Sequence, residues 1–132
     1  MIGIDTNVLV RYLAQDDEKQ SSLATALIES FNHNRRGFIS LIVLVETVWV
    51  MERVFRSPRN EIVGILEDIL GIRDLVVEHS ALAWRALDRF SKENCDFSDC
   101  LIAEIAHQVG CTETFTFDQK AAKRAGMKLL ED

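Results

Sequence analysis

Apolar residues follow two patterns along the chain, short continuous runs and repeats at helical spacing. A short apolar run leads from Ile2 to Asp5, and the pattern from Asn7 to Ala14 predicts a helix directly after it. Residues Asp16 to His33 form a longer segment with a helical repeat. Its apolar positions are Leu23, Ala24, Leu27, Ile28 and Phe31. The first part of the chain is therefore predicted to be a strand followed by two helices.

The same alternation of strands and helices continues to the end of the chain. Phe38 to Ser40 is predicted to be the second strand. The apolar segment Leu41 to Phe55 contains many β-branched residues, but it is too long for one strand, so we predict a helix. Further strands are expected at Leu75–Glu78, Thr114–Thr116 and Met127–Leu130, and further helices at Arg59–Leu70, Ala81–Lys92, Phe97–Val109 and from Asp118 to about Gly126.

Strands that alternate with helices predict an α/β fold with a parallel sheet. We expect about four to five short strands, flanked by helices on both faces of the sheet. The length of 132 residues fits a single domain, 1–132, and no internal repeat or linker-like segment is visible. A domain of this size can fold without a disulfide or a metal.

Composition limits the classes of function. The net charge of −6 argues against a protein that wraps duplex nucleic acid with a broad basic face. It does not exclude a nuclease, because the acidic residues can be concentrated in one pocket. The longest apolar run is too short and too interrupted to span a membrane.

The cysteines and histidines do not suggest a zinc site. The chain has three cysteines, an odd number, and they are Cys95, Cys100 and Cys111. None of them forms a CxxC pair, and the sequence shows no secretion signal, so we expect a reducing cytoplasm. We interpret all three as small buried apolar residues. The histidines show no spacing typical of metal ligands, and they are His33, His79 and His107.

Four acidic residues are predicted to meet at one edge of the sheet, because ligands of such sheets lie beyond the carboxyl ends of the strands. Asp5 ends the first strand, and Glu46 lies about a turn into the helix after the second strand. Asp118 follows the fourth strand. Asp99 lies in the first turn of the helix that leads into that strand, and this helix must run antiparallel to it.

Each of these acids also has a simpler interpretation. Asp5 and Asp118 could cap the helices that follow them. Asp96 and Asp99 are spaced like a capping box, and for Asp96 we favour the capping role. Glu46 has large apolar neighbours three and four residues away, so we expect it to be at least partly buried and to need a partner. Asp99 lies beside the apolar face of its helix.

A divalent cation would explain why so many carboxylates converge. Two carboxylates about 5 Å apart repel by about 3 kcal/mol at an effective dielectric constant near 20. Helix N-termini offset only part of this cost. An all-oxygen site suits Mg²⁺ or Mn²⁺, and such a metal can act on a phosphate and on water. Candidates to bind the rest of a phosphate backbone are Arg11, Arg35, Arg36, Arg53, Arg56, Arg59, Lys120, Lys123 and Arg124.

Four segments, IDTNVLVR, ISLIVLVE, DFSDCLIAEIA and TFTFD, occur in the order that is seen in a known family. The chain resembles PIN-domain ribonucleases, and more closely the VapC toxins of toxin–antitoxin pairs. The resemblance covers nearly the whole chain. It implies a PIN-like fold and an endoribonuclease that depends on Mg²⁺ or Mn²⁺. It also implies an RNA substrate, a homodimer, and a VapB-type antitoxin whose tail enters the active-site groove.

The resemblance assigns the metal and the catalysis to Asp5, Glu46, Asp99 and Asp118. In our hypothesis Asp5 and Asp99 hold the principal metal, while Glu46 and Asp118 complete its shell through water or position a second ion. Thr6 and Asn7 would orient Asp5 by hydrogen bonding. The polar positions that match the family's pocket are Thr6, Asn7, Ser40 and Thr116, and Asp96 matches an accessory acid.

Two other functions are compatible with parts of the sequence. A haloacid-dehalogenase-like phosphatase would use Asp5 as its nucleophile, but Asn7 stands where the second Asp would act as general acid, and Asn cannot give a proton. A catalytically silent protein-binding module of the same fold is the non-enzyme alternative. Loss of one of the four acids would favour that module, and none is missing.

Overall fold

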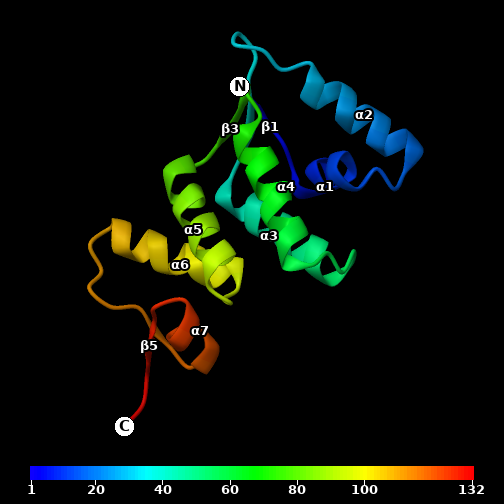
Figure 1. Cartoon of the computed structure of the whole chain (residues 1–132). Coiled ribbons are helices and arrows are strands. Elements are labelled where there is room, and N and C mark those ends of the chain that lie inside the picture. Colours follow the sequence, from blue (N-terminus) through cyan, green and yellow to red (C-terminus); the bar gives the residue numbers. More distant parts are fainter. The chain divides into compact units, whose positions relative to one another are not determined.

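The computed structural model describes all residues from 1 to 132, and the chain divides into two compact units. The first unit comprises Met1–Ser80 and the second unit Ala81–Asp132. Helices and strands alternate through both units (Figure 1), as the pattern of apolar residues predicts. The assignment of residues 1–132 to a single domain stays a prediction.

Three short parallel strands form the sheet of the first unit, in the order β1-β2-β3. Gly37 pairs with both Ile2 and Leu75, and a Cβ at this glycine would collide with the side chains of Phe31 and Leu75. The glycine therefore allows close packing at the start of the central strand. The elements are β1 Ile2–Gly3, α1 Thr6–Ala14, α2 Glu18–Glu29, β2 Gly37–Ile39, α3 Leu41–Arg53, α4 Arg59–Gly71 and β3 Leu75–Val77.

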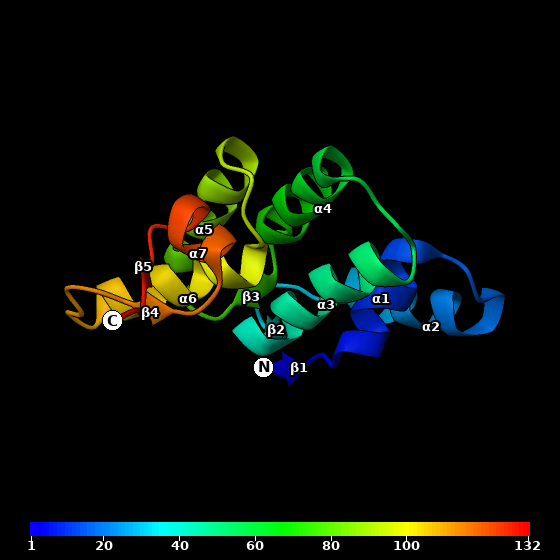
Figure 2. The same cartoon turned by 90° about the horizontal axis from the view of Figure 1, so that it is seen from below.

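The core of the first unit fixes α1 and α3 side by side. α1 contacts both α2 and α3, and Figure 2 shows the pair α1 and α3. Leu9 of α1, Ile39 of β2 and Leu44 of α3 are completely buried. Burial of a side chain of this kind contributes about 1.5–3 kcal/mol. This packing places the first turn of α1, after β1, near the middle of α3.

The second unit contains three helices and a pair of strands. Its elements are α5 Ser80–Lys92, whose first residue belongs to the first unit, α6 Phe97–Gln108, β4 Phe115–Thr116, α7 Gln119–Arg124 and β5 Lys128–Leu129. The buried rings of Phe90 and Phe97 meet edge to face, with their centroids 5.9 Å apart. This contact joins α5 to the start of α6, the helix that carries Asp99.

The predicted α/β class and the five short strands are confirmed, and every strand pair is parallel. The strands belong to two hydrogen-bonded sheets rather than to one. β4 pairs only with β5, through bonds of 2.8 Å from Lys128 N–H to the Thr114 carbonyl and from Leu130 N–H to the Thr116 carbonyl. No helix has both the length and the apolar character that crossing a bilayer requires.

The prediction was right about the type of α3 and wrong about the end of α2. The segment after Ser40 is a helix, as its length indicated, although its β-branched residues favour strands. The second helix was expected to reach His33, but it ends at Glu29. Asn32 closes a turn there, because its side-chain oxygen accepts the backbone N–H groups of Asn34 and Arg35. A local turn of this kind competes with helix continuation.

Candidate active site

Asp5 lies between β1 and α1 and caps the helix, as one of its two interpretations proposed. Its backbone is extended, and its Oδ1 accepts the N–H of Thr6 at 2.8 Å. The side chain is exposed. A carboxylate that accepts a hydrogen bond at a helix N-terminus is stabilised there. The capping bond to Oδ1 therefore holds Asp5 in one orientation at the end of the strand.

The side chain of Thr6 connects α1 to α3. Its hydroxyl donates to Glu46 Oε1 at a distance of 2.6 Å, so it orients Glu46. We had expected both Thr6 and Asn7 to orient Asp5. Only the backbone N–H of Thr6 does so, and Asn7 is exposed and makes no hydrogen bond to Asp5. Thr6 thus contacts both predicted metal ligands of the first unit, Asp5 through its backbone N–H and Glu46 through its hydroxyl.

The expectation that Glu46 is partly buried was wrong. Glu46 is exposed, and so are its apolar neighbours Ile42 and Trp49, at 71% and 54%. The buried face of α3 is formed instead by residues such as Leu44 and Val48. The burial of Glu46 could not be judged from the sequence, because α3 is apolar on nearly every side and the spacing of its apolar residues does not show which face is buried.

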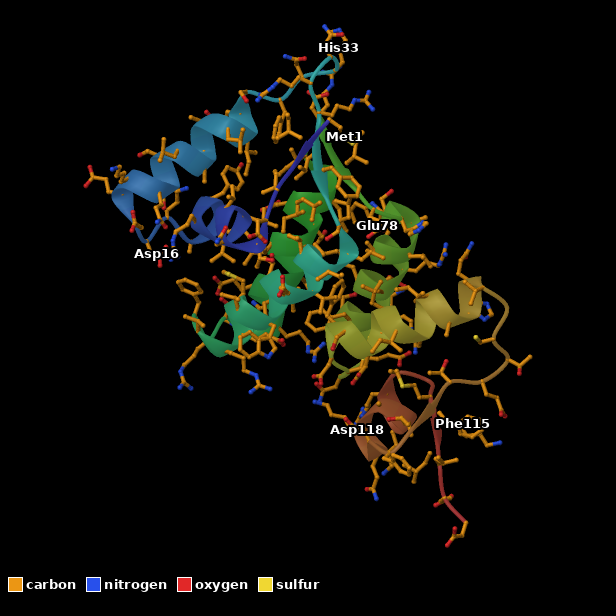
Figure 3. All side chains as sticks on the ribbon, turned by 180° about the vertical axis from the view of Figure 1, so that it is seen from behind. Met1, Asp16, His33, Glu78, Phe115 and Asp118 are labelled. Atoms are coloured by element: carbon orange, nitrogen blue, oxygen red, sulfur yellow. A yellow bond between two sulfur atoms is a disulfide. The ribbon has the colours of Figure 1, made fainter.

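Two side chains fix the start of α3 and thereby the position of Glu46. Ser40 Oγ accepts the N–H of Val43 at 3.2 Å, so this residue, predicted as a polar pocket position, is the N-cap of α3. Glu78 Oε1 accepts the N–H of Leu41 at 2.9 Å, and Figure 3 shows Glu78 beside the start of α3. Sequence reasoning missed Glu78, because its partner depends on the register between β2 and β3.

A cavity of about 460 Å³ lies beside the acids of the first unit. Glu46, Val50 and Val54 follow one another at intervals of four residues, so they lie along one side of α3 and its C-terminal end. The lining therefore changes from acidic near Glu46 to apolar near Val54. The lining residues are Asp5, Thr6, Asn7, Val10, Arg11, Asp16, Glu46, Val50, Val54 and Phe55.

Asp99 is an acid of the second unit whose pKa is raised. It lies in the first turn of α6 and is half-buried, in agreement with its expected place beside the apolar face. Burial raises the pKa of Asp99, and the negative charges of Asp96 and Asp118 raise it further, while Lys120 lowers it. Two acids thus lie near the partly desolvated carboxylate of Asp99, with a single lysine opposing their effect. Crowding of this kind is typical of functional sites.

Asp96 does not cap α6 with its side chain, so the capping role that we favoured is wrong. The residue has the extended backbone of an N-cap, but its carboxylate accepts no capping hydrogen bond. Its Oδ1 lies 3.9 Å from Lys120 Nζ instead, and both side chains are exposed. Asp96 therefore acts on Asp99 as a nearby negative charge and not as the partner in a capping box.

Asp118 caps α7, as its simpler interpretation proposed, and Figure 3 shows it at the start of that helix. Its Oδ1 accepts the N–H groups of Lys120 and Ala121 at 2.8 and 3.3 Å. Thr116 Oγ accepts the N–H of Asp118 at 3.0 Å. Thr116, predicted as a supporting residue, therefore fixes the backbone from which the Asp118 carboxylate projects.

The cysteines agree with the prediction only in part. Cys95 and Cys100 are buried, as expected, but a disulfide joins them across the start of α6. Cys111 is exposed and free, so its predicted burial was wrong. It follows the C-terminus of α6 in an exposed turn, where a small apolar residue has no core to join.

The four predicted metal ligands come from both units. Asp5 and Glu46 belong to the first unit, and Asp99 and Asp118 to the second. No group of three Asp, Glu, His or Cys side chains is close enough in the structure to hold a metal ion. The donors are all oxygens, and burial together with the charges of Asp96 and Asp118 raises the pKa of Asp99, an effect that a hard divalent cation would offset. The donor chemistry therefore fits Mg²⁺ or Mn²⁺, and the four-acid site stays a prediction.

Comparison with known proteins provides an independent test of the resemblance. A VapC ribonuclease from Aquifex aeolicus (strain VF5) is 27% identical over 127 residues, which are 96% of this chain and 93% of that protein. No solved structure matches the chain significantly. The family model described as PIN domain matches residues 2–127, nearly the whole length. The chain therefore belongs to the PIN-domain family.

Proposed function

We propose that the chain is a metal-dependent endoribonuclease and the toxin of a VapBC-type toxin–antitoxin pair. The observation that carries the proposal is the arrangement of Asp5, Thr6 and Glu46 on the wall of one cavity. The chain also belongs to the PIN-domain family and is similar over 96% of its length to a VapC ribonuclease. RNA is the proposed substrate, and the cytoplasm, where RNA is abundant, is the proposed location.

Asp5, Glu46, Asp99 and Asp118 would hold Mg²⁺ or Mn²⁺, with Asp5 and Asp99 as the principal ligands. When bound, the ion supplies positive charge to the phosphate and lowers the pKa of a water ligand. The Thr6 hydroxyl bonds to one oxygen of Glu46 and so fixes the direction of the other. The hydrogen bonds to Asp118 Oδ1 orient that carboxylate in the same way. Such supporting bonds position ligands before the ion binds.

The charge crowding at Asp99 favours a cation over a simple structural role. Ionised Asp99 is disfavoured by burial and by Asp96 and Asp118, and Lys120 opposes this only in part. A helix cap or a surface ion pair needs no such arrangement. A bound divalent cation would make the ionised form favourable again, because opposite charge lowers a carboxyl pKa. Binding of a divalent cation would therefore offset the negative charge around Asp99.

The partners of a VapC toxin complete the proposal. We propose that a VapB-type antitoxin silences the enzyme and that the chain forms a homodimer. Exposed apolar side chains on α3 and α6 offer surface for protein contacts, among them Trp49, Ile102 and Ile105. Burial of such residues is the usual source of stable association. Size-exclusion chromatography with light scattering tests the dimer.

Carboxylate-to-amide variants test the proposed activity. Asp5→Asn and Asp99→Asn, supplied with Mg²⁺ or Mn²⁺, should cleave RNA at least about a hundredfold more slowly, since even loss of a residue that supports a metal ligand costs 10–100-fold. Circular dichroism checks that both variants fold. Asp88→Asn is the matched control, because Asp88 is an exposed acid that pairs only with Lys92 on α5. Cleavage by either site variant at the parent rate would refute the proposal.

A further inference from the structure

The segment from Arg53 to Arg59, RVFRSPR, differs in charge from the rest of the chain. It contains three arginines and no acid, whereas the whole chain has a net charge of −6. Phe55 lies between Arg53 and Arg56 in the sequence. An aromatic residue among basic residues is typical of surfaces that bind single-stranded nucleic acids. The segment follows α3, the helix that carries Glu46.

Phe55 lines the same cavity as the acids of the first unit. Val50, Val54 and Phe55 form an apolar part of the lining, and Asp5 and Glu46 form the acidic part. The apolar part continues from Glu46 along α3 to its end. A nucleotide likewise has an apolar part, its flat base, and a charged part, its anionic phosphate. The cavity can accept the base against Phe55 while the phosphate reaches the acidic part, where the proposed cation would neutralise the acids.

Arg56 is the available cation of this segment. It is exposed, and no ion pair engages it. Arg53 differs, since its guanidinium lies over the ring of Trp49 at 5.8 Å from the centroid. Arg59 has interactions of its own. A guanidinium that is not already engaged can bind a phosphate through two hydrogen bonds.

The backbone conformation at Arg56 allows its side chain to be removed by a glycine substitution without strain. Its φ of +52° is left-handed, and the Ser57 N–H closes the end of α3 on the Met51 carbonyl at 3.0 Å. Glycine is the residue that such a helix end favours. Arg56→Gly therefore removes the guanidinium without disturbing the fold.

We propose that Phe55 and Arg56 form a nucleotide subsite, in which the Phe55 ring stacks on an unpaired base and Arg56 binds a neighbouring phosphate. The inference rests on the proposed ribonuclease function and adds a selection among RNAs. A base inside a duplex is stacked on both faces and cannot reach the Phe55 ring. The enzyme therefore selects an RNA segment whose base next to the cleaved bond is unpaired. A protein segment in the same cavity is the competing occupant.

Binding without metal tests the subsite separately from cleavage. The probe is a short fluorescein-labelled RNA without self-complementarity, alone or annealed to its complement, measured by anisotropy in EDTA at low salt. Phe55→Leu keeps an apolar side chain and should weaken binding of the single strand about tenfold, with little effect on the duplex. Phe55→Trp should retain the affinity. Phe115→Leu is the matched control, because Phe115 is an exposed phenylalanine in the second unit that does not line this cavity.

Arg56 is tested through its salt dependence. Arg56→Gly should weaken binding of the single strand and reduce the slope of log affinity against log salt by about one, as expected for one lost phosphate contact. Arg56→Lys should restore most of the slope, because it restores the charge. A Tm equal to or above that of the parent would show that Arg56→Gly folds normally.

The outcomes separate the subsite from the proposed function. If the parent protein cleaves RNA with Mg²⁺ but Phe55→Leu binds the single strand as the parent does, the subsite is refuted and the ribonuclease stands. If the parent does not cleave but binds single strands through Phe55, the proposed function fails and the subsite stands. Absence of any binding by the parent in EDTA, or equal affinity for single strand and duplex, also refutes the subsite.

Discussion

Asp5 and Glu46 of the first unit are held in a different way from Asp99 of the second. In the first unit, Asp5 and Glu46 are exposed, and hydrogen bonds from Thr6 orient both of them. In the second unit, Asp99 is half-buried, and burial together with Asp96 and Asp118 raises its pKa. Hydrogen bonds thus orient Asp5 and Glu46, as they orient Asp118 of the second unit, whereas Asp99 is distinguished by its burial and by nearby charge. Substitutions that change only geometry or only charge should therefore affect Glu46 and Asp99 differently.

Among the interactions that support the acids, the largest effect is expected for the hydrogen bond between Thr6 and Glu46. Thr6→Val keeps the shape of the side chain but removes the hydroxyl that donates to Glu46 Oε1. RNA cleavage should fall about 10- to 100-fold, because lost support of a metal-binding carboxylate has this size of effect. Thr6→Ser should restore the rate, since it restores the donor. Equal rates for Thr6→Val and the parent, at saturating metal, would show that this bond does not position Glu46 for function.

A smaller effect, on stability, is expected for Glu78, which is far from α3 in the sequence but bonds to the start of that helix. Glu78→Ala leaves the N–H of Leu41 without its acceptor and should lower the free energy of unfolding by about 1 kcal/mol. Glu78→Gln keeps an acceptor oxygen and should lose less. Urea unfolding followed by circular dichroism measures both. A loss of the same size in the two variants would show that the charge, and not the hydrogen bond, stabilises the helix.

The smallest effect concerns charge in the second unit. Because the pKa of Asp99 is raised in the folded protein, ionisation of Asp99 opposes folding at neutral pH. Asp99→Asn should therefore raise the Tm of the metal-free protein at pH 7. The difference should shrink as the pH falls and should vanish below about pH 4, the usual range of an aspartate, where Asp99 is protonated in both states. A Tm difference that does not change with pH would contradict this explanation.

The order of the elements could be predicted from the sequence because it depends on local periodicity. Strands and helices alternate as expected, and the long apolar segment after Ser40 is the predicted helix. The capping bonds of Asp5 and Asp118 were also foreseeable, since a short acid at a helix start caps by local geometry. These features involve residues that are neighbours in the chain.

Features that depend on distant residues could not be predicted. Thr6 bonds to Glu46, and Glu78 to the start of α3, through contacts that arise only from the packing of α1 on α3 and the register of β2 and β3. Glu46 is exposed because the sequence of α3 does not distinguish its inner face. Asp96 has the position of a cap, but its carboxylate lies near Lys120 instead. Periodicity and spacing contain no information about these choices.

The central proposal is that Asp5 and Asp99 are ligands of the principal divalent cation, and Mn²⁺ binding followed by electron paramagnetic resonance tests it most directly. Asp5→Asn removes a predicted ligand from the first unit, Asp99→Asn removes one from the second, and Asp88→Asn is the control. We predict that each of the two site variants binds Mn²⁺ at least about tenfold more weakly than the parent, while the control binds it equally well. Parent-like binding by either Asp5→Asn or Asp99→Asn would contradict the claim.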